Sequence, residues 1–161
     1  MGHQALIYRQ KLDDGLAECR RHLSRLETAF SMLQSRFVFP LDKRQMCKIR
    51  DDSQMLAYSD QCIYRFVKLQ DTMGAKLFKS LLLYLGENTD RPFLDILNQL
   101  EKIDVVDVDE WFEIRDLRNE IAHNYADDEG MVADILNTIF QLKGELSEIL
   151  TQIEKLRNGS R

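Results

Sequence analysis

Arg118, Asn119 and His123 form a short polar group whose residue types and spacing suit chemistry on a phosphodiester bond. Histidine takes up or releases a proton near neutral pH at low cost, because its ordinary pKa lies there. Arginine stays charged and can bind two phosphate oxygens at once. The amide of asparagine can orient either an imidazole ring or a phosphate. These residue types therefore predict a candidate site for phosphate esters, provided that the chain brings them together.

Metal-independent cleavage of RNA is the reaction that these side chains would suit best. The histidine would handle the proton of the 2′-hydroxyl or of the leaving oxygen, and the arginine would stabilise the charge that builds on phosphorus. The alternative is a helix end whose polar side chains only cap the helix and contact solvent, because one arginine and one histidine are a small set for an enzyme. Residue types alone leave both interpretations open.

A helix that begins near Asp107 is expected to carry this polar group. Glu110 follows Asp107 by three residues, which is the spacing of a capping box at a helix N-terminus. At about 100° per residue, the later apolar residues share one face, and this face defines the direction of the core. These residues are Ile114, Leu117 and Ile121.

The polar residues of this predicted helix point in different directions. His123 points almost opposite to the core, with Asn119 one turn earlier and Phe112 further back on the same side. Arg118 lies at the edge of the core-facing side, and Tyr125 lies close to the core direction. A large apolar residue on a polar face suggests that this side is covered, most simply by a partner subunit.

Elsewhere in the chain, apolar residues recur at alternating spacings of four and three, the pattern of amphipathic helices. We expect an all-α fold, an antiparallel bundle of about five helices in one domain over residues 1–161. Two stripes, one on the first helix and one on the last, could pack against each other or against a second copy. The other expected helices begin near residues 51, 90 and 107, the first helix ends near 35, and the last covers about 128–156.

Two glycines are expected to affect the second long helix, which extends from about residue 51 to residue 86. An isolated glycine in a helix interior costs only about 1 kcal/mol relative to alanine, so Gly74 should loosen the helix without ending it. Gly86 follows the last apolar residue of the stripe and is a plausible C-terminal stop.

The net charge of −5 at pH 7 argues against a long nucleic-acid-binding surface, because neutralisation of phosphates supplies most of the affinity of such surfaces. Any contact with nucleic acid must therefore be local. The densest basic segment is residues 43–50, with four cations and no acid. We interpret it as a solvated basic turn between helices, and a patch that binds RNA is the alternative.

The sequence gives no sign of a membrane, a metal or a cofactor. No stretch approaches the roughly 20 apolar residues of a membrane span, and the N-terminus lacks the pattern of a signal peptide. Three cysteines, Cys19, Cys47 and Cys62, show no close pairing and predict reduced thiols in a cytoplasmic protein. Cys19 and His22 alone do not make a zinc site. Trp111 is expected to anchor the core or an interface.

The nine residues LRNEIAHNY, from Leu117 to Tyr125, resemble the signature of the HEPN superfamily. In that signature an arginine and a polar residue are followed, after three further positions, by a histidine. The tyrosine two places after His123 is similar to the HepT-like branch of the superfamily. The pair Arg65 and Phe66 resembles a second, weaker region of this group. The helical layout agrees broadly, but only the nine-residue motif is specific.

The resemblance implies a helical RNase toxin encoded beside a minimal nucleotidyltransferase antitoxin. It implies that two copies of the chain form a homodimer with the active site between them, and that the substrate is RNA, either tRNA or mRNA. Arg118 and His123 would be the catalytic pair, with Asn119 as their polar companion. Tyr125 would be the residue that the nucleotidyltransferase adenylylates to silence the toxin, although a structural role for this tyrosine is equally open.

A second hypothesis follows from the acidic run Asp127-Asp128-Glu129 directly after the motif. Carboxylates close to a phosphate-binding site repel RNA. Some proteins of the group are described as substrate-binding partners of a nucleotidyltransferase rather than as nucleases. The alternative function is therefore a non-catalytic subunit that binds a nucleotidyltransferase.

Overall fold

The chain folds into an all-helical bundle in the computed structural model. The structure describes residues 2–124 and 128–159, and for Asn124 it describes the backbone alone. The prediction of an all-α fold is confirmed for these residues. The elements in chain order are α1 (His3–Gln34), α2 (Lys43–Arg50), α3 (Ser53–Thr72), the π-helical segment η1 (Met73–Leu77), α4 (Phe78–Tyr84), α5 (Phe93–Lys102), α6 (Val108–Asn124) and α7 (Glu129–Arg157).

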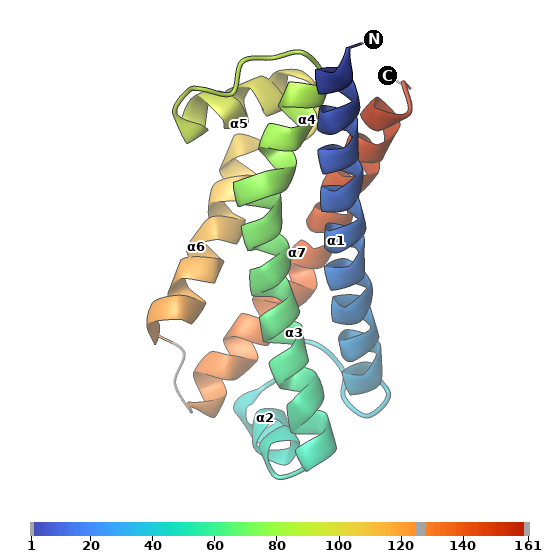
Figure 1. Cartoon of the computed structure of the whole chain (residues 1–161). Coiled ribbons are helices and arrows are strands. Elements are labelled where there is room, and N and C mark those ends of the chain that lie inside the picture. The colour runs from blue at the N-terminus through green and yellow to red at the C-terminus, as the bar shows by residue number, and fades with distance from the viewer. Residues whose placement is uncertain (1, 125–127, 160–161) are drawn as a thin grey trace.

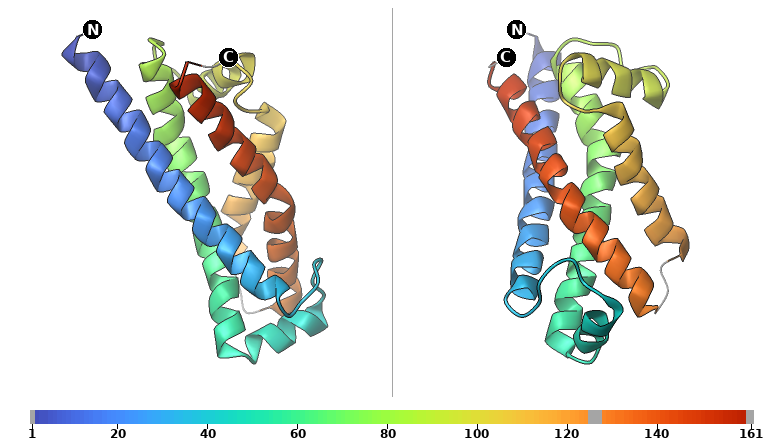
Figure 2. Two further views of the ribbon diagram at one scale, coloured as in Figure 1. Left: turned by 90° about the vertical axis from the view of Figure 1, so that its right-hand side faces the viewer. Right: turned by 180° about the vertical axis from the view of Figure 1, so that it is seen from behind.

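The long helices lie along the axis of the bundle, and two short helices close its ends (Figure 1). α2 lies at one end, and α5 lies at the other, beside both chain termini. α6 lies at one edge of the bundle in opposite views (Figures 1 and 2). One face of α6 therefore packs on the rest of the chain, and the opposite face is directed outward.

The first and last helices pack against each other within the chain (Figure 2). The guanidinium of Arg157 in α7 donates from Nε and Nη2 to the two carboxylate oxygens of Asp13 in α1, at 2.7 and 3.1 Å. Further along the same pair of helices, Arg20 forms an ion pair with Glu154. Of the two arrangements that the apolar stripes allowed, the structure has the intramolecular one.

Helix ends follow the capping signals of the sequence. The side chain of Asp52 accepts hydrogen bonds from the backbone N–H groups that open α3, and Asp128 does the same for α7. Gly86 adopts a φ of +85°, a conformation that glycine takes without steric cost, just after α4 ends. The expected boundaries of the first, second and last helices are therefore confirmed to within a few residues.

The basic segment at residues 43–50 is a helix, so the expected turn is wrong. Asp42 and Gln45 form a capping box, in which the Asp42 side chain accepts from the Gln45 N–H and the Gln45 side chain accepts from the Asp42 N–H. Met46 and Ile49 are buried on its inner side. The two buried apolar side chains and the reciprocal cap stabilise this helix. The run of cations in the sequence led us to expect a turn instead.

Gly74 lies in η1, where the rod formed by α3, η1 and α4 widens locally from α-helical to π-helical turns. The helix continues through this position, as predicted. A Cβ atom at Gly74 would lie 3.2 Å from Cζ2 of Trp111 in α6. The missing side chain therefore lets the indole of Trp111 approach the rod closely.

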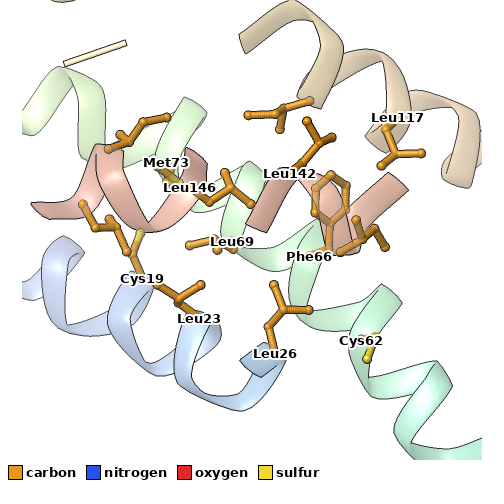
Figure 3. Close-up of a cluster of buried hydrophobic side chains, with 14 of the residues drawn as sticks. Cys19, Leu23, Leu26, Cys62, Phe66, Leu69, Met73, Leu117, Leu142 and Leu146 are labelled. Carbon is orange, nitrogen blue, oxygen red and sulfur yellow. The ribbon is translucent and has the colours of Figure 1, made fainter. Parts of the chain in front are cut away.

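The inner face of α6 is part of the hydrophobic core. Trp111, Ile114, Leu117 and Ile121 are all buried, and Leu117 points toward the cluster that contains Phe66 and Leu142 (Figure 3). The assignment of Trp111 as a packing anchor is confirmed in the core, where its ring contacts Phe78 edge to face at a centroid distance of 4.7 Å. This packing fixes the rotation of α6 and hence the direction of its polar residues.

Among the described helices, none combines the length and the apolar composition needed to cross a membrane.

Candidate functional site

Arg118 lies at the boundary between the two faces of α6 and is held by Asp71 of α3. Its Nε donates to Oδ1 of Asp71 at 2.8 Å, and its Nη2 donates to Oδ2 at 3.1 Å. The side chains remain 30% and 42% exposed, respectively. The expected position of Arg118 at the edge of the core-facing side is confirmed, and a bidentate pair fixes the plane of its guanidinium.

Hydrogen bonding to Asp71 raises the pKa of Arg118 above its already high ordinary value. The guanidinium is therefore charged at every physiological pH. It has five N–H donors, and the contact with Asp71 occupies two of them. The remaining donors, on Nη1 and the outer side of Nη2, have no acceptor among the residues that the structure describes.

His123 and Asn119 lie one turn apart on the outward face of α6, and both are exposed. Neither side chain makes a hydrogen bond or an ion pair with any other residue that the structure describes. The prediction that His123 points away from the core is confirmed. An exposed imidazole without a partner is accessible to a substrate or to a second protein chain.

One copy of α6 does not bring Arg118 and His123 to the same point. Five residues separate them, which corresponds to about 140° around an α-helix. Arg118 accordingly turns toward Asp71 of α3, whereas His123 is exposed on the outward face of α6. A phosphate bound between these two side chains would need one of them from another copy of the chain.

The burial of Phe112 does not require a partner subunit. Its ring is partly buried and packs against the hydrophobic core of its own chain. Phe112 therefore gives less support than the sequence suggested for a face of α6 that is covered by a partner subunit. The homodimer stays a prediction, now based on the separation between Arg118 and His123.

Tyr125, the candidate for adenylylation, lies outside the described residues, as does Asp127. The other two carboxylates of the acidic run have partners within the chain. Asp128 caps α7 by accepting from the backbone N–H groups of Gly130 and Met131, and Glu129 forms an ion pair with Arg50 of α2. The local repulsion of a phosphate by these two groups is reduced accordingly.

Asp71 is a candidate site residue that the sequence analysis did not identify. It is 47 residues away from Arg118 in the chain, and its position on the polar side of α3 resembles that of many surface acids. No local pattern links the two residues, because their contact is a consequence of how α3 and α6 pack.

A different region, between α1 and α3, contains Cys19, His22 and Arg65. Cys19 is fully buried in the core, and burial raises the pKa of its thiol to about 12. A guanidinium N–H of Arg65 donates to Nδ1 of His22 at 2.8 Å. Phe66, the neighbour of Arg65 in the weaker motif, belongs to the core. These residues do not contact the polar group on α6.

The fold and the site together define an all-α bundle with an open polar face on an edge helix. No family model, curated protein or solved structure matches the chain. The residues of α6 and their surroundings are therefore the features from which a function can be inferred.

Proposed function

We propose that the chain is a metal-independent endoribonuclease of the HEPN type, active as a homodimer and acting as the toxin of a toxin–antitoxin pair. The observation that carries the proposal is the arrangement of Arg118, Asn119 and His123 on α6. Asn119 and His123 are exposed and free of partners among the described residues, and Arg118 is fixed by Asp71 at the boundary of the same helix. This arrangement suits a substrate that arrives from solvent.

In the proposed reaction the 2′-hydroxyl oxygen of the RNA attacks the adjacent phosphorus, and the bond from phosphorus to the 5′-oxygen breaks. The His123 imidazole accepts the proton of the hydroxyl and then delivers it to the leaving 5′-oxygen. The free N–H groups of Arg118 bind the non-bridging oxygens as negative charge builds on them. Asn119 orients the imidazole or the phosphate. The products are a 2′,3′-cyclic phosphate and a 5′-hydroxyl.

A second copy of the chain supplies the missing half of this site. If the outward faces of two α6 helices approach each other around a two-fold axis, Arg118 of one copy can face His123 of the other. The same symmetry gives two equivalent sites, each with Arg118 of one copy and His123 of the other. The position of α6 at the edge of the bundle leaves this face open for such an approach (Figure 1).

The test of the proposal compares the purified chain with its His123→Ala variant on total cellular RNA, with a chelator present. We expect the parent protein to cleave RNA and the variant to be slower by at least about 100-fold, which is typical for loss of a general acid or base. His3→Ala is the matched control, because His3 is an exposed histidine at the start of α1. Equal cleavage by His123→Ala and the parent chain would refute the proposal.

The exposed acids beside His123 favour a second candidate function. Asp116 and Glu120 are exposed on α6 on either side of Asn119, and they would repel RNA while attracting a basic protein surface. In this alternative the chain is a non-catalytic subunit that binds a nucleotidyltransferase. The purified protein would then leave every RNA intact, and Asp116→Lys would weaken capture of the nucleotidyltransferase.

Silencing of the toxin by its partner can be tested separately. We propose that the hydroxyl oxygen of Tyr125 attacks the α-phosphorus of ATP on the nucleotidyltransferase, so that AMP is attached and pyrophosphate leaves. Incubation with the partner and ATP should add the mass of one adenylyl group to the parent chain and none to Tyr125→Phe. Silencing of Tyr125→Phe to the same extent would indicate that the partner only masks the site.

A further inference from the structure

A basic surface lies along the seam between α1 and α3, outside the candidate site on α6. The two helices pack side by side (Figure 1), and an N–H of Arg65 in α3 donates to Nδ1 of His22 in α1 at 2.8 Å across their contact. Cations one turn apart lie at this contact on each helix, and an aromatic ring lies beside them. We call this surface the basic seam, and its residues are Arg21, Arg25, Tyr64, Arg65 and Lys68.

Three of the four cations have no carboxylate partner among the described residues. Arg21, Arg25 and Lys68 are exposed, and none of them makes a hydrogen bond or an ion pair with another residue that the structure describes. Arg20, the neighbour of Arg21, differs because it forms an ion pair with Glu154 of α7. The cations of the basic seam are therefore accessible to an anion that arrives from solvent.

Arg65 is partly buried, and its partner in the seam is uncharged. Burial, and after it the charge of Arg65, lowers the pKa of His22. Arg21 and Lys68 act in the same direction, and Glu18, 4.0 Å from Nε2 of the ring, opposes them. The imidazole is therefore neutral near pH 7 and leaves the charge of Arg65 uncompensated. A partly buried cation is costly without a counter-charge, and an anion outside the seam would offset this charge from a distance.

Acidic groups reduce the charge of the basic seam but do not cancel it. Glu18 lies one turn before Arg21 on α1, and Asp60 lies one turn before Tyr64 on α3. Four cations against two acids leave an excess of two positive charges, on a chain whose net charge is −5. The basic seam is therefore a local patch, which is what the overall charge requires of any contact with nucleic acid.

The aromatic ring of the basic seam is Tyr64. Its side chain is 50% exposed, and its ring centroid lies 5.2 Å from Cζ of Arg65 and 5.8 Å from Nζ of Lys68. An exposed ring can stack an unpaired base while the cations beside it bind the neighbouring phosphates, which is how many proteins bind single strands. An acidic protein surface would not need the ring, and a double helix offers no unstacked base. The combination favours single-stranded RNA.

The basic seam lies close to the candidate site along α3. Asp71, which holds Arg118 through a bidentate contact, follows Tyr64 by two turns and points in almost the same direction. Two turns correspond to about 10 Å along the helix axis. One extended strand that crosses α3 can therefore contact both Arg118 and the basic seam.

We propose that the basic seam binds a stretch of single-stranded RNA outside the active site, with phosphates on its cations and one base stacked on Tyr64. The strand continues over α3 toward Arg118. A contact of this kind holds the substrate equally before and during the reaction, so it should lower KM and leave kcat unchanged. This role in cleavage rests on the proposed function, whereas the binding of RNA does not.

The first test measures the charge of the contact. The His123→Ala chain, which lacks the proposed base, is titrated with a labelled single-stranded oligoribonucleotide of mixed sequence and about ten nucleotides. Fluorescence anisotropy at several salt concentrations gives Kd and its salt dependence. For single strands, log Kd should rise with log salt concentration by about 0.7 for each phosphate contact.

A double variant of exposed cations tests whether the RNA lies on the basic seam. Arg21→Gln with Lys68→Gln should raise Kd at least about tenfold and lower the salt slope by about 1.4, because two phosphate contacts are lost. Arg9→Gln with Lys102→Gln is the matched control, since both cations are exposed and lie outside the basic seam. The control changes the net charge equally and should leave Kd and the slope nearly unchanged.

Substitution of Tyr64 tests whether a base stacks on the basic seam. Tyr64→Leu should raise Kd about tenfold without changing the salt slope, because a stacking contact is lost and no charge is removed. Tyr64→Phe is the control, because it keeps the ring, and it should bind as well as the parent residue. If Tyr64→Leu binds normally and polyglutamate displaces the RNA at equal charge, the partner is an acidic protein and the assignment to RNA is overturned.

The outcomes separate this inference from the proposed function. If the parent chain cleaves no RNA but binding depends on Arg21, Lys68 and Tyr64, the basic seam stands and the nuclease proposal fails. If the parent chain cleaves RNA and the double variant raises KM at unchanged kcat, both stand. Absence of binding, or an unchanged Kd and salt slope in the double variant, would overturn the basic seam whether or not RNA is cleaved.

Discussion

Two arginine–aspartate pairs connect distant helices of this bundle with almost the same geometry. Arg157 of α7 binds Asp13 of α1 at 2.7 and 3.1 Å, and Arg118 of α6 binds Asp71 of α3 at 2.8 and 3.1 Å. All four side chains are partly exposed. Judged by their distances alone, the two pairs would receive the same role.

Their surroundings differ. Near Arg157 the polar groups are used within the fold, because the hydroxyl of Tyr84 donates to the backbone carbonyl of Arg157 at 3.0 Å. Near Arg118, the amide oxygen of Gln70 and the indole N–H of Trp111 lack partners among the described residues. A bidentate pair therefore does not mark a functional site by itself, and the two pairs differ in whether the polar groups around them are paired.

Removal of the two arginines should give the largest difference between the pairs. We expect Arg118→Ala to slow RNA cleavage by about 100- to 1,000-fold, the usual cost of losing a group that stabilises charge in the transition state. Arg157→Ala should leave cleavage unchanged. Each substitution should lower the free energy of unfolding by no more than about 1 kcal/mol, because partly exposed ion pairs contribute little. Single-turnover cleavage and urea unfolding measure the two effects, and an equal loss of cleavage in both variants would contradict the distinction.

Substitution of the aspartates should give a smaller difference in the same direction. Asp71 positions Arg118, so Asp71→Asn should slow cleavage by about tenfold, as is common for residues that orient a functional group. The pH dependence of the rate should keep its shape, because Asp71 exchanges no proton with RNA. Asp13→Asn is the control and should cleave normally. Faster cleavage by Asp71→Asn would show instead that Asp71 withholds Arg118 from the substrate.

The smallest expected effects are changes in the free energy of unfolding with pH. A carboxylate with a cationic partner and a carboxylate without one should change this free energy in opposite directions. Hydrogen bonding to Arg157 lowers the pKa of Asp13, so its contribution is present above the ordinary value of 3.8 and is lost as pH falls through the lowered value. Burial and then the nearby Glu110 and Glu113 raise the pKa of Glu145. Its charged form is therefore destabilising above the raised value, and this penalty disappears as pH falls toward 4.5.

Urea unfolding of two isosteric variants checks these signs. Asp13→Asn should be less stable than the parent chain at neutral pH, and the difference should vanish in strong acid. Glu145→Gln should be more stable at neutral pH, with a gain that shrinks on acidification, and both differences should stay within about 1 kcal/mol. Glu27→Gln on the exposed side of α1 is the control. Reduced stability of Glu145→Gln at neutral pH would contradict the account.

Most of the fold could be predicted from the sequence, because the helices depend on local signals. Apolar periodicity predicted three long elements and most of their ends, and the caps at Asp52 and Asp128 lie at two of the expected starts. α2 was missed because its stabilising groups, a capping box and two buried side chains, are few beside its cations. The π-helical geometry at Gly74 was only partly visible, since it depends on the fit of Trp111 against η1.

Less of the candidate site could be predicted from the sequence. Helical geometry correctly placed His123 outward and Arg118 at the boundary of α6, because both directions follow from the rotation that the buried face imposes. Asp71 could not be found, since it reaches Arg118 through the packing of α3 against α6. Phe112 does not indicate a face covered by a partner subunit, because it packs against the core of its own chain. A helical wheel does not show how wide a face the neighbouring helices cover.

The central claim is that two outward faces of α6 form two equivalent active sites, each with Arg118 of one copy and His123 of the other. It is tested most directly by mixing Arg118→Ala with His123→Ala under conditions that allow subunits to exchange. Each variant alone should be inactive. Half of the mixed population is heterodimer with one intact site of two, so the mixture should regain about a quarter of the parent activity. An inactive mixture that demonstrably contains heterodimers, beside a parent chain that cleaves RNA, would contradict the shared site.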